Sequence, residues 1–352
     1  MKFFIGGEYF PSPLDFVAAK RYDLQSYSLN RFKYKYTYFT GGGIHSLFQI
    51  LKHLNLGEND FILLPSYICP SVIIPFNVLK IKYKIYKIDS ALDIDINFLK
   101  SICTKDCKAL LFINYFGFPI SDISKATLLK LSAEGILLIQ DLVHGFFSDL
   151  ELIGDFCFNS FRKFSPYDGS IISSKSKIET EFNNLNKGYV FYKILGQFLR
   201  FLTLRTGIDL SRKFISFLNQ AEIRYNNSAQ LPINKFFLRQ IEKMDFQKLQ
   251  IRRKYFKELL ENFLDISLYK YLPDNVIPVG FPIVIDNRDN IRERLKNKNI
   301  YCPIHWTLPY QVDREEFSDS FKLSNAILTL PITENITINN FNKYVKILKE
   351  TL

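Results

Sequence analysis

Two short apolar runs, Ala109-Leu-Leu-Phe-Ile113 and Ile136-Leu-Leu-Ile-Gln-Asp141, flank a segment at 121–134 with helical periodicity. Each run has the length and composition of a strand that is buried on both faces, as strands of parallel sheets are. The same alternation of short apolar strands and helices continues on both sides of this stretch. The pattern therefore predicts an α/β fold, in which helices cover both faces of a mostly parallel sheet.

The rest of the chain extends this pattern and then changes. We expect strands at 61–64, 80–88, 156–161 and 170–173, with helices at 44–54, 70–78 and 95–103. After about residue 178 we expect one long helix or two at 232–264, strands at 276–285 and 327–330, and helices at 288–297 and 337–351. We therefore divide the chain into a large domain at 1–235, which includes an irregular N-terminal arm, and a smaller C-terminal α/β domain at 236–352.

Composition excludes several classes of protein. Of the 352 residues, 47% are hydrophobic and 16% aromatic, which is enough for a large core. The net charge is +11, but the lysines are scattered, and in Lys80-Ile-Lys-Tyr-Lys-Ile-Tyr-Lys87 they alternate with apolar residues as on a half-exposed strand. We therefore expect no nucleic-acid partner. The sequence contains no apolar stretch long enough for a signal peptide or a membrane span, and its five irregularly spaced cysteines indicate free thiols, no metal site and a cytoplasmic location.

Three motifs could carry chemistry. The first is Gly41-Gly-Gly-Ile-His45, which opens the helix expected at 44–54. A helix N-terminus presents unpaired N–H groups and the positive end of the helix dipole, so it binds phosphate, and glycines permit a close approach. An ordinary glycine loop before a helix would look the same, and for this motif alone that interpretation is the better one.

The second motif is Ile139-Gln-Asp-Leu-Val-His144, at the end of an apolar strand. A carboxylate at Asp141 could pair with a pyridinium nitrogen and make the ring a better electron sink. His144 would lie near the same ring. Equally, Asp141 could cap the following turn, with His144 as a core histidine whose hydrogen bonds are satisfied.

The third motif is Ser160-Phe-Arg-Lys163, followed by Asp168-Gly-Ser170. A lysine inside an apolar run after a strand can have a lowered pKa and form a Schiff base with an aldehyde cofactor. Ser160 and Arg162 could anchor a phosphate or the backbone. The alternative is an Arg–Lys pair in a surface loop.

Taken in order, the three motifs resemble the fold-type I pyridoxal-phosphate (PLP) enzymes, and in particular the DegT/DnrJ/EryC1/StrS group of sugar aminotransferases. Further similar segments span nearly the whole chain: Ile5-Gly-Gly-Glu8, Leu63-Leu-Pro-Ser-Tyr-Ile-Cys-Pro-Ser71, Asn114-Tyr-Phe-Gly117, Pro303-Ile-His-Trp306 and Leu328-Thr-Leu-Pro-Ile332. The resemblance implies a three-layer sandwich and PLP as the cofactor.

The resemblance also implies roles for individual residues. Lys163 would bind the cofactor covalently and move a proton, Asp141 would hold the pyridine nitrogen, and His144 would lie beside the ring. The phosphate would be held by Gly43, Ile44 and His45 with Ser160, and Tyr67 or Cys69 would cover the ring face, with Tyr67 favoured. Substrate-binding positions implied by similar segments are Tyr115, Arg224, Asn226 and His305.

Two features depart from the group's pattern. The group more often places its lysine five residues after the serine, a position that Ser165 occupies here, and Gly169-Ser170 stands where Gly-Gly is usual. We keep Lys163, because the shorter spacing occurs elsewhere among fold-type I enzymes. The departures indicate a divergent branch, and they leave open a relative that binds without turnover.

These features imply an aminotransferase that acts on a nucleotide-linked ketosugar, with an amino acid such as glutamate as donor, in surface polysaccharide or amino-sugar biosynthesis. The alternatives are a non-catalytic or regulatory relative, or another PLP reaction such as acyl condensation or dehydration. Dehydratases of this group replace the lysine, typically with histidine, so Lys163 argues against that branch. The resemblance also implies a homodimer.

The segment at 189–218 is apolar but interrupted by cations such as Arg200 and Arg205. A basic amphipathic helix could rest on an anionic membrane. It could also bury its apolar side against a dimer partner, with the cations outside or facing an acidic substrate. We favour burial, because apolar stripes at helical spacing usually belong to a core.

Overall fold

The computed structural model describes residues 3–7, 34–182, 187–228, 230–334 and 336–352. The chain forms two compact units, each built from separated stretches. Among the described residues, the first unit comprises 34–54, 158–182, 187–228 and 230–245, and the second comprises 3–7, 55–157, 246–334 and 336–352. The division into a large domain at 1–235 and a small domain at 236–352 stays a prediction.

Parallel strands form the centre of the second unit. Their order is β6-β5-β3-β4, with β3 at Phe61–Pro65, β4 at Lys82–Tyr86, β5 at Cys107–Ile113 and β6 at Leu137–Asp141. Helices α3 (Pro70–Leu79), α4 (Ile96–Ile102) and α5 (Asp122–Ala133) connect them, and the 3₁₀ turn η2 (Tyr115–Gly117) follows β5. Every residue of β3 is buried, as expected for an apolar run in a parallel sheet.

The C-terminal part of the second unit is smaller. Strands β9 (Phe281–Val284) and β11 (Ile327–Leu330) pair antiparallel, and β1 (Ile5–Gly6) pairs in parallel with β10 (Ile300–Tyr301). The helical elements around them are η4 (Phe246–Gln250), α9 (Ile251–Phe263), α10 (Arg288–Asn297), α11 (Ser318–Ala326) and α12 (Ile338–Lys349). The fully buried Arg252 bonds Glu334, with Nη2 and Oε2 2.8 Å apart.

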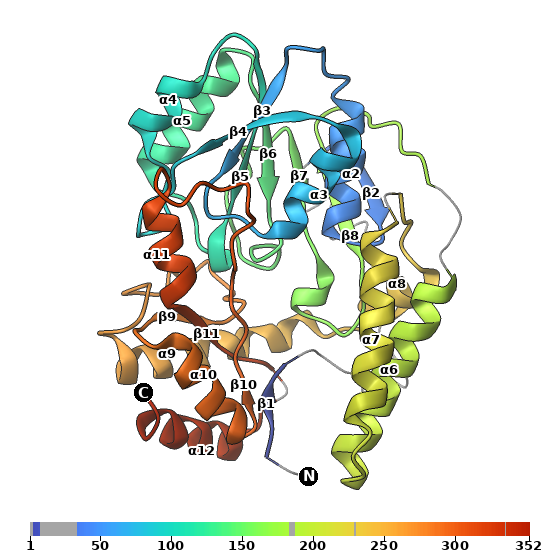
Figure 1. Cartoon of the computed structure of the whole chain (residues 1–352), viewed down its shortest axis with the longest axis vertical. Coiled ribbons are helices and arrows are strands. Elements are labelled where there is room, and N and C mark those ends of the chain that lie inside the picture. The colour runs from blue at the N-terminus through green and yellow to red at the C-terminus, as the bar shows by residue number, and fades with distance from the viewer. Residues whose placement is uncertain (1–2, 8–33, 183–186, 229, 335) are drawn as a thin grey trace. The chain divides into compact units, whose positions relative to one another are not determined.

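The first unit combines a strand pair with helices. Strands β2 (Tyr36–Thr40) and β8 (Ser170–Ser174) run antiparallel, and α2 (Gly43–His53) follows β2 directly. The 3₁₀ turn η3 (Phe161–Lys163) precedes β8, and helices α6 (Lys187–Thr206), α7 (Ser211–Asn226) and α8 (Lys235–Ile241) follow it. Figure 1 shows α6 and α7 as a long antiparallel pair, packed side by side.

The large sheet has seven strands in the order β2-β8-β7-β6-β5-β3-β4, and β7 (Phe156–Phe158) is where the chain passes from the second unit to the first. A mostly parallel seven-stranded sheet with a small C-terminal sheet is the predicted α/β class. The pairing of β2 with β8 is antiparallel. The fold-class prediction is confirmed.

One strand prediction was wrong. The strand expected at 156–161 ends at Phe158, because the chain turns into η3. Of the one long helix or two expected at 232–264, the structure confirms two, α8 and α9, which are separated by turns and η4. Strand β2 and helix α11 were not predicted.

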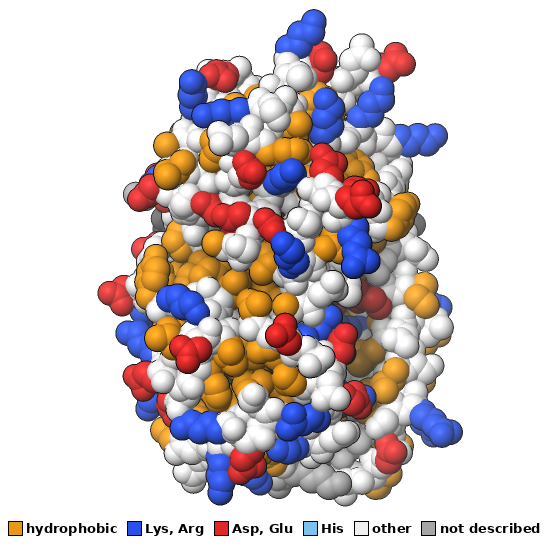
Figure 2. All heavy atoms as spheres, turned by 60° about the vertical axis from the view of Figure 1, so that its left-hand side comes forward, with side chains coloured by type: hydrophobic (Ala, Val, Ile, Leu, Met, Phe, Trp, Pro, Cys, Tyr) orange, Lys and Arg blue, Asp and Glu red, His pale blue; other side chains and the backbone are white. Residues whose placement is uncertain are grey.

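The described surface carries mixed charge. On the face drawn in Figure 2, lysines and arginines are interspersed with aspartates and glutamates, and apolar side chains gather between them. This agrees with the scattered lysines in the sequence. In the part of the chain that the structure describes, no helix is long and apolar enough to cross a bilayer.

Candidate active site

The carboxyl ends of parallel strands in the second unit carry one group of predicted site residues. Asp141 is the last residue of β6 and stands opposite Ile113, the last residue of β5. Tyr115 follows β5, and Tyr67 follows β3. Ligands of open α/β sheets bind at such strand ends, so the position suits a cofactor.

Asp141 is buried, and one carboxylate oxygen accepts a hydrogen bond from the backbone N–H of Val143 at 2.8 Å. The carboxylate therefore does cap the following turn, which fixes its direction. It also acts electrostatically on Tyr115, whose pKa is raised well above its usual value by burial first and then by neighbouring tyrosines and Asp141. Asp141 thus caps the turn, as one of the two interpretations of the sequence had it, and its carboxyl group is buried at the end of the strand.

His144 lies in an aromatic cluster of the second unit. Its Nδ1 accepts the N–H of Phe116 at 3.3 Å, which assigns the proton of a neutral ring to Nε2. The ring of Trp306 stacks on it, with centroids 5.1 Å apart and planes 21° apart, and the ring of His305 meets its edge at 4.9 Å. His144 is therefore held in one orientation and one tautomer.

Tyr67 is fully buried and ties this cluster together. Its hydroxyl donates to the carbonyl of His305 and accepts the N–H of Trp306 at 3.1 Å. The hydroxyl of Tyr115 in turn donates to the carbonyl of Tyr67 at 2.6 Å. Burial raises the pKa of Tyr67, so its hydroxyl stays protonated. The structure thus brings Asp141, His144, Tyr67, Tyr115 and His305 together within one unit.

Trp306 was missed by the sequence reasoning, which named it only within a motif. It is the single tryptophan of the chain and is partly exposed, and its ring also approaches those of Tyr67 and Tyr115 at 5.8 and 6.2 Å. No local signal marks this residue, because its contacts come from distant parts of the sequence.

The N-terminus of α2 carries the second group, in the first unit. Within the described residues no side chain caps this helix end, so its first N–H groups depend on another partner. A Cβ on Gly42 would lie 1.7 Å from the hydroxyl oxygen of Tyr225, and one on Gly41 would lie 2.8 Å from the side chain of Leu231. Both glycines are therefore required for close packing, and the phenol of Tyr225 points at the helix end.

His45 occupies the first turn of α2 and is buried. Its Nε2 lies 3.1 Å from the carbonyl oxygen of Tyr225, and its Nδ1 has no hydrogen-bond partner among the described residues. Burial lowers the pKa of His45 to about 4, so the ring is neutral near pH 7. Because a carbonyl oxygen only accepts, the single proton of the neutral ring lies on Nε2, and Nδ1 is left as a hydrogen-bond acceptor.

Tyr225 is the site residue that the sequence reasoning overlooked on α7. Arg224 bonds the side chain of Gln220 at 2.7 Å and lies over the ring of Tyr192, and Asn226 approaches Glu222 at 3.5 Å. Tyr225 between them is buried, and its hydroxyl lies beside Gly42 at the start of α2. The helical spacing of the buried Ala221 and Tyr225 was the available signal.

Lys163 ends the 3₁₀ turn after Ser160 and is half-buried. Arg162 beside it bonds Glu222 at 3.1 Å, and its guanidinium lies 5.0 Å from the centre of the Tyr225 ring. Arg162 is thus held by α7. The structure brings Ser160 and Lys163 together on one turn, and it places Gly43, Ile44 and His45 on the first turn of α2.

The chemistry of these groups fits PLP. An uncapped helix N-terminus and a buried phenol beside it suit a phosphate, and neither brings a negative charge. Asp141 supplies a buried carboxylate for a ring nitrogen, and Lys163 supplies an amine.

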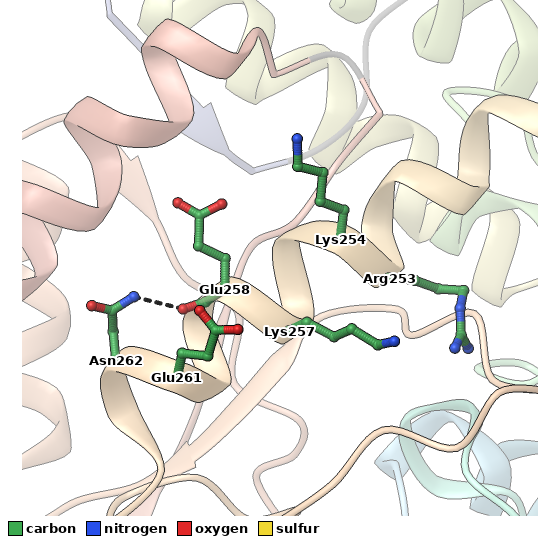
Figure 3. Close-up of a pocket in the computed structure, with 6 residues that line it drawn as sticks. All are labelled: Arg253, Lys254, Lys257, Glu258, Glu261 and Asn262. Carbon is green, nitrogen blue, oxygen red and sulfur yellow. Dashed lines mark hydrogen bonds between the residues drawn. The ribbon is translucent and has the colours of Figure 1, made fainter.

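The surface depressions of the described chain fit a ligand less well. Figure 3 shows one of about 660 Å³, lined by residues of α9 alone: Arg253, Lys254, Lys257, Glu258, Glu261 and Asn262. Its three bases come first along the helix and its two acids follow, on a flank that is partly exposed. Another, of about 210 Å³, contains Gln140, whose amide is already bonded to Asn114 and to the backbone of Ile153 and Gly154. In the described ranges no three His, Cys, Asp or Glu side chains form a metal cluster.

No family model matches the chain. A stretch of 112 residues, 31% of the chain, is 30% identical to "Protein TIC 214" of Cuscuta obtusiflora. The chain spans about 6% of that protein's length, so the match carries no inference about function.

Solved structures match over nearly the whole chain. A DegT DnrJ EryC1 StrS aminotransferase from Brucella abortus matches with a TM-score of 0.66 at 13% identity, covering 97% of this chain and 91% of that one. A sugar aminotransferase from Micromonospora echinospora matches with a TM-score of 0.64 at 12% identity over 98% and 94%. The GDP-4-keto-6-deoxy-D-mannose-3-dehydratase of E. coli, with bound hydrated PLP, matches with a TM-score of 0.67 at 16% identity over 98% and 100%. The chain therefore has the fold of the DegT/DnrJ/EryC1/StrS sugar aminotransferases, at a sequence identity that marks it as divergent.

Proposed function

We propose that the protein is a PLP-dependent aminotransferase. It would move an amino group from an amino acid such as glutamate to a ketosugar linked to a nucleotide. The observation that supports this most is the buried Asp141 at the carboxyl end of β6, in a chain that shares its fold with PLP enzymes over nearly its whole length. A pathway in surface polysaccharide or amino-sugar biosynthesis, a cytoplasmic location and a homodimer belong to the same proposal.

Bound PLP would supply an aldehyde and a ring that withdraws electrons from the substrate carbon. Lys163 would bind the aldehyde through its side-chain amine in the resting protein, and that amine, once released, would take a proton from the substrate and return it. Asp141 would pair with the ring nitrogen and keep it protonated. Its direction is set by the N–H of Val143. His144, fixed in orientation by Phe116 and Trp306, lies beside the ring.

The phosphate end has its own set of ligands. The first-turn N–H groups of α2 and the hydroxyl of Ser160 would bind it, and the phenol of Tyr225 would add a neutral donor. Tyr115, Arg224, Asn226 and His305 are the proposed substrate contacts. Tyr67 shapes the wall beside the ring through its bonds to the 305–306 backbone.

A second candidate is a relative that binds the cofactor without turnover. Ser165 at the usual lysine position and the close packing of Leu231 and Tyr225 on Gly41 and Gly42 favour it. Dehydration is a further PLP reaction on this fold, since one matching structure is a dehydratase. Lys163 argues against it.

The test is an amino-donor half-reaction. The purified protein is loaded with PLP, freed of excess cofactor and mixed with glutamate alone. We expect about one equivalent of 2-oxoglutarate per bound cofactor. Bound cofactor with no 2-oxo acid formed from glutamate or any other common amino acid would favour the non-catalytic candidate, and absence of bound cofactor would contradict both.

A further inference from the structure

Helix α6 turns a polar face inward. Tyr189, Lys193 and Gln197 recur at intervals of four residues, so they lie in one row, and they are only 3%, 8% and 2% exposed. On another side of the helix, Phe191 and Phe198 are 61% and 53% exposed. We expected the cations of this segment outside or facing an acidic substrate; Lys193 and Arg200 are both buried in the structure.

The inward row contacts one short loop. Tyr189 donates its hydroxyl to the Oδ2 of Asp168, and the ammonium of Lys193 lies 3.5 Å from the same oxygen. Gln197 donates to the carbonyl of Pro166. Three successive turns of α6 therefore hold the segment between η3 and β8.

That segment carries Lys163 at its start. The two ends of this loop are joined by a hydrogen bond, in which the N–H of Phe161 donates to the carbonyl of Gly169 at 2.9 Å. Inside it, the hydroxyl of Ser165 accepts the N–H of Tyr167 at 3.0 Å and donates to the carbonyl of that residue at 2.8 Å. The loop thus has a closed base and a fixed turn, and the row on α6 sets where the turn lies.

The charges explain why the row is polar. Asp168 is 2% exposed, and a buried carboxylate is costly unless it is paired and hydrogen-bonded. Lys193 supplies the countercharge, and burial raises the pKa of Tyr189 well above its usual range, so the phenol remains a donor. Apolar side chains could fill the same space without this desolvation cost, and buried ion pairs often fix position better than they stabilise.

We propose that Asp168, held by Tyr189 and Lys193, is a positioning residue that orients Lys163 for reaction with an aldehyde. This inference rests on the proposed role of Lys163. The pair acts through the backbone of residues 163–168 and does not touch the reacting atoms.

The test compares Asp168→Asn and Lys193→Met with two matched controls. Asp209→Asn changes an exposed carboxylate that bonds the Ser211 N–H between α6 and α7, and Arg205→Met removes an exposed cation on α6. Two readouts are taken. One is hydrogen exchange of the amides at 163–169 in cofactor-free protein, and the other is the pH profile for borohydride trapping of PLP at Lys163.

We expect faster loop exchange and at least tenfold slower trapping in both test variants, with a shifted pH profile, and wild-type values in both controls. Asp168→Glu should recover part of the trapping rate. The double variant Asp168→Asn/Lys193→Met should lose no more than the worse single variant, because the two residues act as one pair. If either single variant fails to fold, Tyr189→Phe removes only one hydroxyl from the same contact and is measured in the same way.

The outcomes separate the inference from the proposed function. Wild-type trapping rates and pH profiles in Asp168→Asn and Lys193→Met, with trapping at Lys163 in the parent protein, would overturn the positioning role alone. Wild-type loop exchange in those variants would overturn it as well. If the parent protein traps no cofactor at Lys163, the proposed function fails, and with it the inference.

Discussion

At the residue scale, Asp141 has two roles, one in holding a turn and one in the proposed chemistry. Its bond from the Val143 N–H needs only an oxygen acceptor, which an asparagine side chain also offers. Its pairing with a ring nitrogen needs the negative charge.

We therefore expect Asp141→Asn to keep the fold and lose about 2–4 kcal/mol of transition-state stabilisation, as other single electrostatic contacts in active sites do. That is a fall of roughly 30- to 1000-fold in kcat/KM. Steady-state kinetics measures it, with circular dichroism to verify the fold. Asp122→Asn, at an exposed position of α5, is the control. Near-normal turnover in Asp141→Asn would remove Asp141 from the mechanism.

His45 gives a pH dependence of stability. Its folded pKa of about 4 lies below the 6.5 of an unperturbed histidine, so the unfolded chain takes up a proton first as the pH falls. The stabilisation that comes from keeping His45 neutral in the folded state is complete above about pH 6.5 and is lost as the pH falls from there to pH 4.

Between pH 7 and pH 5 the wild-type protein should therefore lose about 2 kcal/mol of unfolding free energy through this group. His45→Gln should lose less over the same interval. Urea unfolding at the two pH values measures the difference. Equal losses in both proteins would show that His45 does not titrate as the structure implies.

Most of the candidate site residues could be predicted from short local motifs in the sequence. Asp141 and His144 follow an apolar strand, and Lys163 follows Ser160 at a recognisable spacing, so their types and order indicated one chemistry. Tyr225 and Trp306 were missed, because their positions depend on packing between segments distant in sequence. The buried Lys193 was misjudged for the same reason, since its partner Asp168 lies on another element.

At the element scale, buried strands and amphipathic helices were the predictable part. The helix at 44–54 and the strand at 327–330 are confirmed by α2 and β11, since apolar runs and helical periodicity report burial directly. Helix α11 escaped prediction, because it starts at Ser318 without a side-chain cap and few of its residues are apolar. Strand β2 was missed, because its residues Tyr36–Thr40 are mostly only half-buried.

The start of α2 gives the element-scale prediction. In Gly42→Ala the new methyl group would meet the hydroxyl of Tyr225. Overpacking of this kind costs about 1–3 kcal/mol. Gly57→Ala is the control, because its new methyl would meet only the end of the Asp60 side chain. Urea unfolding measures both.

Removing the hydroxyl should relieve the clash. The double variant Gly42→Ala/Tyr225→Phe should be more stable than Gly42→Ala alone, although the ring still lies close. A Gly42→Ala protein as stable as the Gly57→Ala control would mean that Tyr225 does not pack on the helix start.

At the scale of the whole molecule, the exposed apolar side chains of α6 would be stabilised by burial against a partner. Phe191 and Phe198 lie on the side of the helix away from the inward polar row. A homodimer, which the family resemblance implies, would cover such a stripe and remove it from water.

We expect the protein to sediment as a dimer, at about twice its chain mass of 41.3 kDa. The double variant Phe191→Ser/Phe198→Ser should shift the equilibrium toward monomer. Ile123→Ser, at an exposed position of α5, serves as the control and should not. A monodisperse monomer with full activity would contradict the dimer. Salt-sensitive flotation of the dimer with anionic liposomes would instead favour a membrane for this stripe.

The most direct measurement is the mapping of the cofactor to one lysine. The protein is incubated with PLP, reduced with borohydride and digested, and the peptides are analysed by mass spectrometry. We predict a phosphopyridoxyl group on Lys163 at about one per chain, together with loss of the visible absorbance and of the adduct in Lys163→Ala. An adduct on another lysine, or an undiminished adduct in Lys163→Ala, would contradict the account.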